Sequence, residues 1–159
     1  MLAAAGERSG TTLINVYSDL CGCSVLKEAG GSAVDGIATR LPRVRIDGLC
    51  DDRSLVGPYL IRVDLQGAEL SVLEGARKTL GETEMVILEV SLSQLYMKGP
   101  QFHGVVACMK DRGFVVNDLF GALCRPFHGP LGHIDVPFVQ ENGHFSTSHF
   151  YRQRREGTA

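Results

Sequence analysis

Two carboxylates in this chain stand where α/β folds build their sites. Asp64 ends one apolar run, residues 59–63, and Glu89 comes near the end of a second, residues 85–90. Continuous apolar runs of this length are typical of buried parallel strands, whose carboxyl ends share one edge of the sheet. A carboxylate at that edge can take a proton from a substrate hydroxyl or orient it. We therefore assign Asp64 as the candidate catalytic base and expect Glu89 to face the same crevice and bind substrate.

The turn after Asp64 carries further candidates for substrate contact. Gln66 and Gly67 follow the acid, and Glu69 opens the helical pattern behind them. Glycine in such a turn adopts a backbone conformation closed to other residues, or lets a ligand approach the backbone. Tyr96 lies in the loop after the second strand, and loops often carry binding residues. We expect Gln66, Gly67, Glu69 and Tyr96 to contact the substrate.

Each acid also has a structural interpretation. Asp64 could cap the following helix through its amides, and Glu69 could interact with the helix dipole instead of a ligand. Glu89 could be a buried acid paired with Arg62 or with a backbone amide. The acids could also share a divalent cation.

The histidines and cysteines do not complete a metal site. His133 and Asp135 share one face of an expected strand, but no third firm ligand accompanies them. Cys21 and Cys23 form a lone C-x-C, whereas a structural zinc site usually needs four well-spaced ligands. We therefore expect no metal, and a metal-dependent hydrolase built on the two acids and the histidines is an alternative that lacks a ligand motif.

The composition predicts one globular domain, residues 1–151, with a basic flexible tail at 152–159. The chain has 159 residues, of which 44% are hydrophobic and 21% charged, and its net charge is -2. The tail holds its only cationic cluster, so we expect no nucleic-acid partner. No apolar run reaches the ~20 residues that span a bilayer, so we expect no membrane partner. Five irregularly spaced cysteines predict buried free thiols and a cytoplasmic location.

The elements that position the acids follow from the apolar periodicity. Helices are expected at residues 68–80, where Gly75 indicates close packing against the sheet, and at 100–112. Residues 18–36, rich in Gly, Ser and Cys, are expected to form a long loop. Two β-α-β steps followed by hairpin-like strands predict an α/β fold whose mixed sheet has antiparallel edge strands. The expected strands are 11–17, 43–46, 59–65, 85–90, 114–120, 134–139 and 147–151.

The segment around Asp64 also resembles a known signature. Residues 59–76 read YLIRVDLQGAELSVLEGA. They resemble the FkbM-type methyltransferases, which use S-adenosylmethionine and read roughly lysine-isoleucine-aspartate-valine-glutamate-glycine-alanine-glutamate there, before a leucine-rich helix ending in glycine-alanine. Residues 4–10, 18–26 and 44–47, and the strand that ends in Glu89, are similar to further family segments. The resemblance covers most of the chain.

The resemblance implies a Rossmann-like class I methyltransferase fold and O-methylation of a hydroxyl on a small molecule or sugar. It makes Asp47 the candidate cofactor contact, with a helix cap as the alternative. The family fold begins with a strand and a Gly-rich turn that receive S-adenosylmethionine, and neither precedes Thr11. We therefore expect an N-terminally truncated, partial form of the fold. The alternative is a catalytically inactive remnant that acts as an α/β interaction module or is an inert fragment.

A missing first strand has a consequence for the sheet. In the full fold, the strand at residues 59–63 lies between the Glu89 strand and the cofactor-binding strand. Without the latter it would present unpaired amides and carbonyls along an apolar edge, and such edges pair with other chains. We expect the chain to self-associate through this edge, or residues 11–17 to occupy it.

Overall fold

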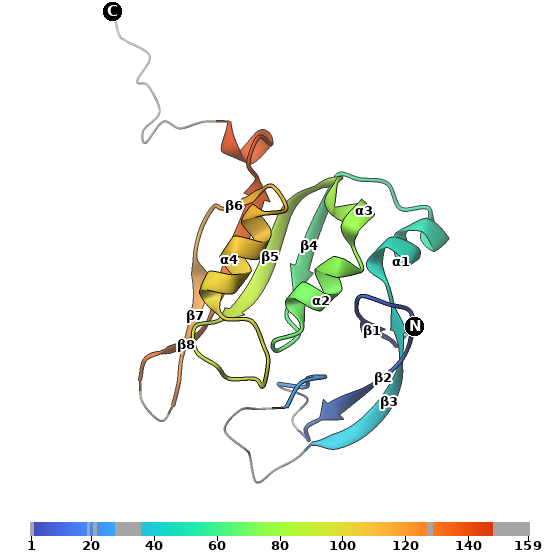
Figure 1. Ribbon diagram of the computed structural model, residues 1–159, viewed down its shortest axis with the longest axis vertical. Helices are drawn as coiled ribbons and strands as arrows, with labels where there is room; N and C mark the ends of the chain where they lie inside the picture. The colour runs from blue at the N-terminus through green and yellow to red at the C-terminus, as the bar shows by residue number, and fades with distance from the viewer. Residues whose placement is uncertain (1, 19, 21, 28–35, 127–128, 148–159) are drawn as a thin grey trace, which may run out of the picture.

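A computed structural model describes residues 2–18, 20, 22–27, 36–126 and 129–147 of the chain (Figure 1). Its main layer is a five-stranded mixed sheet. The strand order is β4-β5-β8-β6, and β7 also pairs with β8. β4 runs parallel to β5, whereas β8 is antiparallel to β5, β6 and β7. The strands are β4 (Tyr59–Val63), β5 (Thr83–Ser91), β6 (Phe114–Val116), β7 (Phe120–Cys124) and β8 (Leu131–Gln140).

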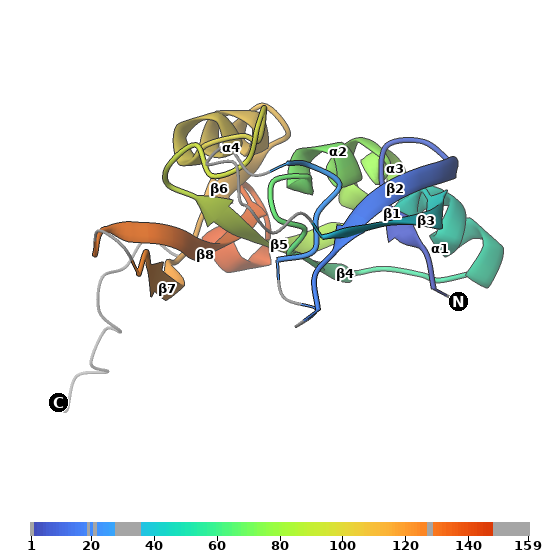
Figure 2. The ribbon, with the colours of Figure 1, turned by 90° about the horizontal axis from the view of Figure 1, so that it is seen from below.

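Three helices cover one face of this sheet. Figure 2 shows α2 (Glu69–Glu74), α3 (Arg77–Leu80) and α4 (Phe102–Lys110) as a layer above the strands. The strand side chains alternate between the two faces, so Val86, Leu88 and Val90 of β5 are fully buried while their neighbours are half-buried. Val72, Leu73, Val105 and Met109 pack from the helices into the same core. The opposite face carries no helix within the described ranges.

A second, three-stranded sheet lies beside the first. It contains β1 (Ala4–Ala5), β2 (Gly10–Val16) and β3 (Ile37–Val44) in the order β1-β3-β2, with β1 parallel and β2 antiparallel to β3. The helix α1 (Ile46–Arg53) then leads to β4 (Figure 1). The expected mixed α/β architecture is therefore confirmed, with two mixed sheets in place of the one that was predicted.

The helix expected at residues 68–80 is two helices, because the chain breaks at Gly75. A Cβ atom on Gly75 would lie 2.2 Å from the backbone oxygen of Gly6. Gly75 therefore allows a close approach of the N-terminal segment, not of the five-stranded sheet as its position had suggested. The Asp47 amide donates to the Gly75 carbonyl at 3.0 Å, so α1 is joined to the same break.

Other boundaries also differ from the sequence-based expectation. The strand expected at 43–46 is the end of β3, and α1 already begins at Ile46. The strand expected at 114–120 is interrupted between β6 and β7, where the Asp118 carboxylate accepts a hydrogen bond from the Leu119 amide. The strand expected at 147–151 is wrong at Thr147, which follows the 3-10 helix η1 (His144–Ser146). Residues 148–159, including the expected tail, lie outside the described residues.

The prediction that residues 11–17 cover the β4 edge is wrong. They form β2, which pairs with β3. Among the described residues, β4 has a strand partner on one side only, and Leu60 on this edge strand is 63% exposed. The self-association prediction concerns this open edge.

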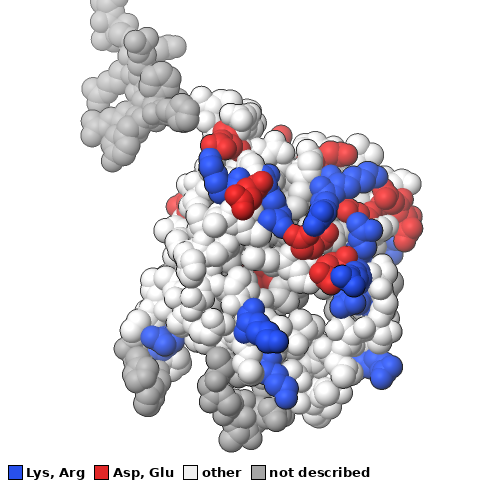
Figure 3. All heavy atoms as spheres, in the orientation of Figure 1, with Lys and Arg blue, Asp and Glu red and all other residues white. Residues whose placement is uncertain are grey.

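Four described cysteines, at positions 23, 50, 108 and 124, carry free thiols, but none is fully buried, contrary to the expectation. Cys21 lies outside the described residues. Within the described ranges, no helix is both long and apolar enough to cross a membrane. Figure 3 shows acidic and basic side chains interleaved over α1 and α3, where Lys78 pairs with Asp51 and Arg77 with Glu74. Charges over these helices therefore compensate one another locally.

Candidate active site

Three carboxylates lie side by side at the carboxyl end of β4 and β5. The parallel register places Val63 opposite Leu88, so that Asp64 comes beside Glu89. The antiparallel register then pairs Glu89 directly with Asp135 of β8. Because side chains alternate along strands, these acids point away from the helix layer, on the uncovered face of the sheet. The expectation that Asp64 and Glu89 approach each other is thus confirmed, and Asp135 joins them.

The Gln66 side chain links the first two acids. Its Nε2 atom donates to Asp64 Oδ1 at 3.2 Å and to Glu89 Oε2 at 2.8 Å. Its Oε1 atom accepts a hydrogen bond from the Tyr96 hydroxyl. The backbone of Gln66 has a φ of 54°, and its carbonyl accepts from the buried Ser24 hydroxyl at 2.9 Å. Gln66 is therefore fixed at both ends, and it holds two carboxylates together.

Gly67 and Glu69 shape the turn that carries Gln66. Gly67 has a φ of 97°, and a Cβ atom there would lie 3.1 Å from a Leu26 methyl and 3.2 Å from Tyr96 Cβ. A side chain at this position would be strained and would press on both loops. Glu69 is 3% exposed, and its Oε1 atom accepts from the amides of Gly67 at 2.9 Å and Leu65 at 3.2 Å. This burial favours a structural role for Glu69 over contact with a substrate.

The site divides its charge unevenly among the acids. Arg62 Nη2 lies 3.4 Å from Asp64 Oδ2 and 3.7 Å from Asp135 Oδ2. No such cation faces Glu89 among the described contacts, because its neighbour is His133, whose Nδ1 is 3.8 Å from Glu89 Oε2. Burial lowers the pKa of His133, which keeps the imidazole neutral at neutral pH. The alternative in which Glu89 pairs with Arg62 is therefore not what the structure shows.

Glu89 consequently holds a proton more tightly than an ordinary glutamate. Burial, followed by the charge of Asp64 and its hydrogen bond, raises the pKa of Glu89 to about 7, and Asp135 and Glu69 add to the effect. A general base works best when its pKa lies near the operating pH. Of the three acids, Glu89, which the sequence suggested only as a substrate contact, is therefore the one whose pKa is raised towards neutral pH.

Residues 4–116, more than two thirds of the chain, match the family model described as the methyltransferase FkbM domain. The chain belongs to the FkbM methyltransferase family. The resemblance predicted from residues 59–76 is thereby confirmed. Comparison with curated proteins and with solved structures finds no match.

The FkbM match contains most of the cluster but not all of it. Asp64, Gln66, Glu89 and Tyr96 fall within residues 4–116, whereas His133 and Asp135 on β8 lie beyond them. The match thus covers the paired acids Asp64 and Glu89 and the turn and loop that carry Gln66 and Tyr96. The β8 residues enter the site through the sheet pairing described above.

Asp47, the expected cofactor contact of this FkbM domain, is 6% exposed and faces α3. Its Oδ1 atom accepts from the amide and the hydroxyl of Thr79, both at 2.9 Å. Its Oδ2 atom accepts from the Lys78 amide at 3.3 Å and from Arg45 Nη2 at 3.0 Å. These hydrogen bonds outweigh burial and lower the pKa of the Asp47 carboxyl. The arrangement favours the helix cap over an adenine contact.

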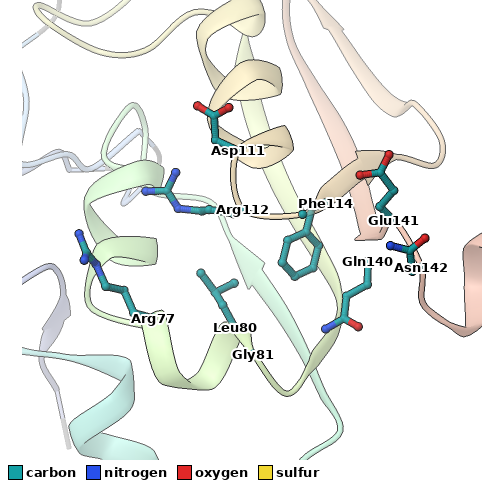
Figure 4. A pocket seen from close by; sticks show the side chains of 10 residues that line it. Arg77, Leu80, Gly81, Asp111, Arg112, Phe114, Gln140, Glu141 and Asn142 are labelled. Carbon is teal, nitrogen blue, oxygen red and sulfur yellow. The ribbon is translucent and has the colours of Figure 1, made fainter.

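A cavity of about 610 Å³ lies at the other end of the sheet (Figure 4). Arg77 and Arg112 project towards it, but both pair with Glu74, and Glu141 pairs with Lys110. Its lining includes Gly81, which comes just before β5, so it opens at the end of the sheet opposite Asp64. Because Arg77, Arg112 and Glu141 already have partners and the cavity is remote from the acids, we do not assign chemistry to it.

Sequence reasoning missed Ser24 and underrated Asp135. Ser24 lies in the Gly- and Ser-rich loop and reaches Gln66 across 42 positions, a contact that no local pattern signals. Asp135 became a site residue only through the β5–β8 register. Among the described residues, no three histidine, cysteine or acidic side chains are arranged to hold a metal ion. His128 and Cys21 lie outside that part of the chain.

Proposed function

We propose that this chain forms the acceptor side of an S-adenosylmethionine-dependent methyltransferase that methylates a hydroxyl of a small molecule or sugar. The observation that carries the proposal is the Gln66 amide bridging Asp64 and Glu89 at the carboxyl end of the sheet. Family membership supports methyl transfer, and it favours an enzyme over an inactive interaction module. The hydroxyl acceptor is what the family resemblance implies, and the acid cluster supports it because a hydroxyl must lose its proton as the new bond forms.

In this proposal Glu89 receives the proton of the acceptor hydroxyl. The Gln66 amide hydrogen bond to Glu89 Oε2 fixes the carboxylate, and the Tyr96 hydroxyl fixes the amide in turn. Asp64, paired with Arg62, orients the acceptor beside Glu89. Holding the acceptor oxygen in line with the methyl donor is the larger part of catalysis in such a displacement, since positioning replaces a bimolecular encounter.

The described residues do not form a complete cradle for S-adenosylmethionine. A cavity of about 370 Å³ lies between the end of β4 and the first sheet, near the lower end of the ~300–1,000 Å³ typical of ligand sites. Its walls are mostly apolar, with Asp64 and Arg62 at the rim, but none of the described strands leads into a Gly-rich turn of the G-x-G-x-x-G type. We expect calorimetric titration with S-adenosylmethionine to give a Kd in the millimolar range or weaker, which corresponds to a binding free energy of ~-4 kcal/mol or less favourable. Binding in the micromolar range would contradict this.

The experiment is transfer of a labelled methyl group from millimolar S-adenosylmethionine to a panel of sugars and hydroxy acids. We expect a labelled O-methyl product, and a rate lower by about 100-fold in Glu89→Gln, which keeps size and hydrogen bonding but removes the base. Asp64→Asn is the matched comparison, because it tests the other acid of the pair. A larger loss in Asp64→Asn than in Glu89→Gln would return the base to Asp64. No labelled product from any hydroxyl acceptor would contradict the proposed function.

A further inference from the structure

A second cavity adjoins the carboxylate cluster. It has a volume of about 460 Å³ and lies between the loop after β5 and the β7–β8 pair. Leu95, Leu123 and Pro126 provide apolar walls, while Tyr96, Arg125 and His133 provide polar groups. A concave, mostly apolar space with a few converging polar groups is what small-molecule sites look like.

Two residues join this cavity to the proposed base. Tyr96 lines it, and its hydroxyl also donates a hydrogen bond to Gln66, the residue that holds Glu89. His133 lines it too, with Nδ1 3.8 Å from Glu89 Oε2. The cavity therefore reaches the side chains that flank Glu89, although Glu89 itself is not part of its lining.

Arg125 is the unexplained group of this cavity. Its Nε atom is buried and has no hydrogen-bond partner, one of only two such side-chain atoms in the described chain. The other is Ser93 Oγ, at the start of the loop that forms the opposite wall. Arg62 and Arg112, in contrast, each face an acid. A buried N–H group without a partner is rare because it costs free energy, so Arg125 is the residue of this cavity whose placement the rest of the fold does not explain.

The backbone also accommodates the Arg125 side chain. A Cβ atom on Gly132 would lie only 3.0 Å from Arg125 Cγ, so this glycine lets the aliphatic stem lie against β8. The stem is thus held in place while the guanidinium group lines the cavity. A guanidinium group held in this way can bind an anion with two parallel hydrogen bonds.

The charge of the cavity selects the kind of anion. Arg125 is its single full cation, because burial lowers the pKa of His133 and keeps that ring neutral. The acids of the cluster lie just behind His133 and repel a doubly charged group. The single positive charge of Arg125, with the acids of the protein nearby, therefore matches a ligand with one singly charged carboxylate better than a ligand with a phosphate dianion.

We propose that Arg125 binds the carboxylate of the acceptor, so that the substrate is a hydroxy acid or sugar acid that presents its hydroxyl to Glu89. This inference rests on the proposed function, since it names the acceptor of the same site. The cavity volume fits a molecule of monosaccharide size.

The test compares three methyl glycosides that differ only at C6. Methyl glucuronoside carries a carboxylate where methyl glucoside carries a hydroxymethyl group, and methyl glucoside 6-phosphate carries a phosphate ester. Each is titrated into the full chain by NMR without any methyl donor. We expect the glucuronoside to bind at least about tenfold more tightly than either of the others, because only it fills the Arg125 fork with a matched charge.

Variants then locate the effect. Arg125→Gln should reduce the preference for the glucuronoside to less than about twofold, since the fork is lost. Arg40→Gln, which removes the same charge from exposed β3, should leave the preference unchanged. Equal affinity of wild-type chain for glucuronoside and glucoside, including no measurable binding of either, overturns the inference, as does tighter binding of the phosphate. Failed methyl transfer with an intact, Arg125-dependent preference would refute the proposed function alone.

Discussion

Replacing Glu89 by Gln should stabilise the protein, and the gain in stability should grow as the pH rises from about 4.5 to 7. The folded state raises the pKa of Glu89 from 4.5 to about 7, so between these values the folded chain binds more protons than the unfolded chain. Stability therefore falls as pH rises from about 4.5 to 7, and it is level above that range. Each pKa unit corresponds to ~1.4 kcal/mol, which gives an upper limit of ~3.5 kcal/mol for the full loss.

The expected magnitude is smaller than this limit. Glu89 keeps a side-chain exposure of 20%, and water and salt screen part of its repulsion with Asp64 and Asp135. We expect the free energy of unfolding of Glu89→Gln, relative to that of the wild type, to be roughly 1–2 kcal/mol higher at pH 8 than at pH 4.5, because Gln never carries the charge. The substitution that removes the proposed base would thus make the protein more stable. Such a trade of stability for activity is common at active sites that hold mutually repelling charges.

Urea unfolding from pH 4.5 to 8 measures this difference. Glu82→Gln, at an exposed position just before β5, serves as the control and should show no comparable trend. A Glu89→Gln stability difference that is the same at every pH would refute the reasoning, because it would mean that Glu89 is ionised at the same pH in the folded and unfolded chains.

Three further perturbations test the frame of the site. Asp47→Asn should destabilise by about 1–3 kcal/mol in thermal unfolding at pH 7, since buried bonds to α3 weaken, and by progressively less as the pH falls through the lowered pKa of Asp47 and the wild-type carboxylate becomes protonated. Gly75→Ala should lower the free energy of unfolding by ~1–3 kcal/mol or more, because its Cβ would clash with the Gly6 backbone. Gly104→Ala in α4, where a Cβ meets open space, should be neutral or stabilise by up to ~1 kcal/mol, and equal effects of the two substitutions would contradict the packing argument. Leu60→Lys should reduce self-association in sedimentation experiments because a charge blocks the open β4 edge, and a wild-type chain that stays monomeric would refute this.

The parts of the fold that the sequence predicted well are those set by local pattern. β4 and β5 are mainly apolar runs, and such runs specify strands without help from distant residues, although β4 is an edge strand among the described residues, with an exposed Leu60, and is not buried on both sides as expected. α4 begins just after Pro100 and ends before Gly113, as the start and stop signals indicated. Since the ends of β4 and β5 determine where Asp64 and Glu89 lie, the pairing of these acids could also be predicted.

The parts that escaped prediction depend on contacts between distant segments. The break between α2 and α3 exists because Gly6 approaches Gly75, and periodicity in residues 68–80 contains no sign of it. The anchoring of Gln66 depends on Ser24 in a loop that has no regular pattern. The unequal charge environments of Asp64 and Glu89 follow from where Arg62 points, and side-chain pairing of this kind is not encoded in spacing.

The measurement that tests the account most directly is the dependence of the methyl-transfer rate on pH. With saturating hydroxyl acceptor and millimolar S-adenosylmethionine, the wild-type rate should rise about tenfold per pH unit below 7 and level off above it, because Glu89 must be ionised to accept the proton. Glu89→Gln should lose both the rate and the inflection. A wild-type rate that does not change across pH 6–8, or a Glu89→Gln variant that keeps the wild-type profile, would contradict the assignment of Glu89 as the base.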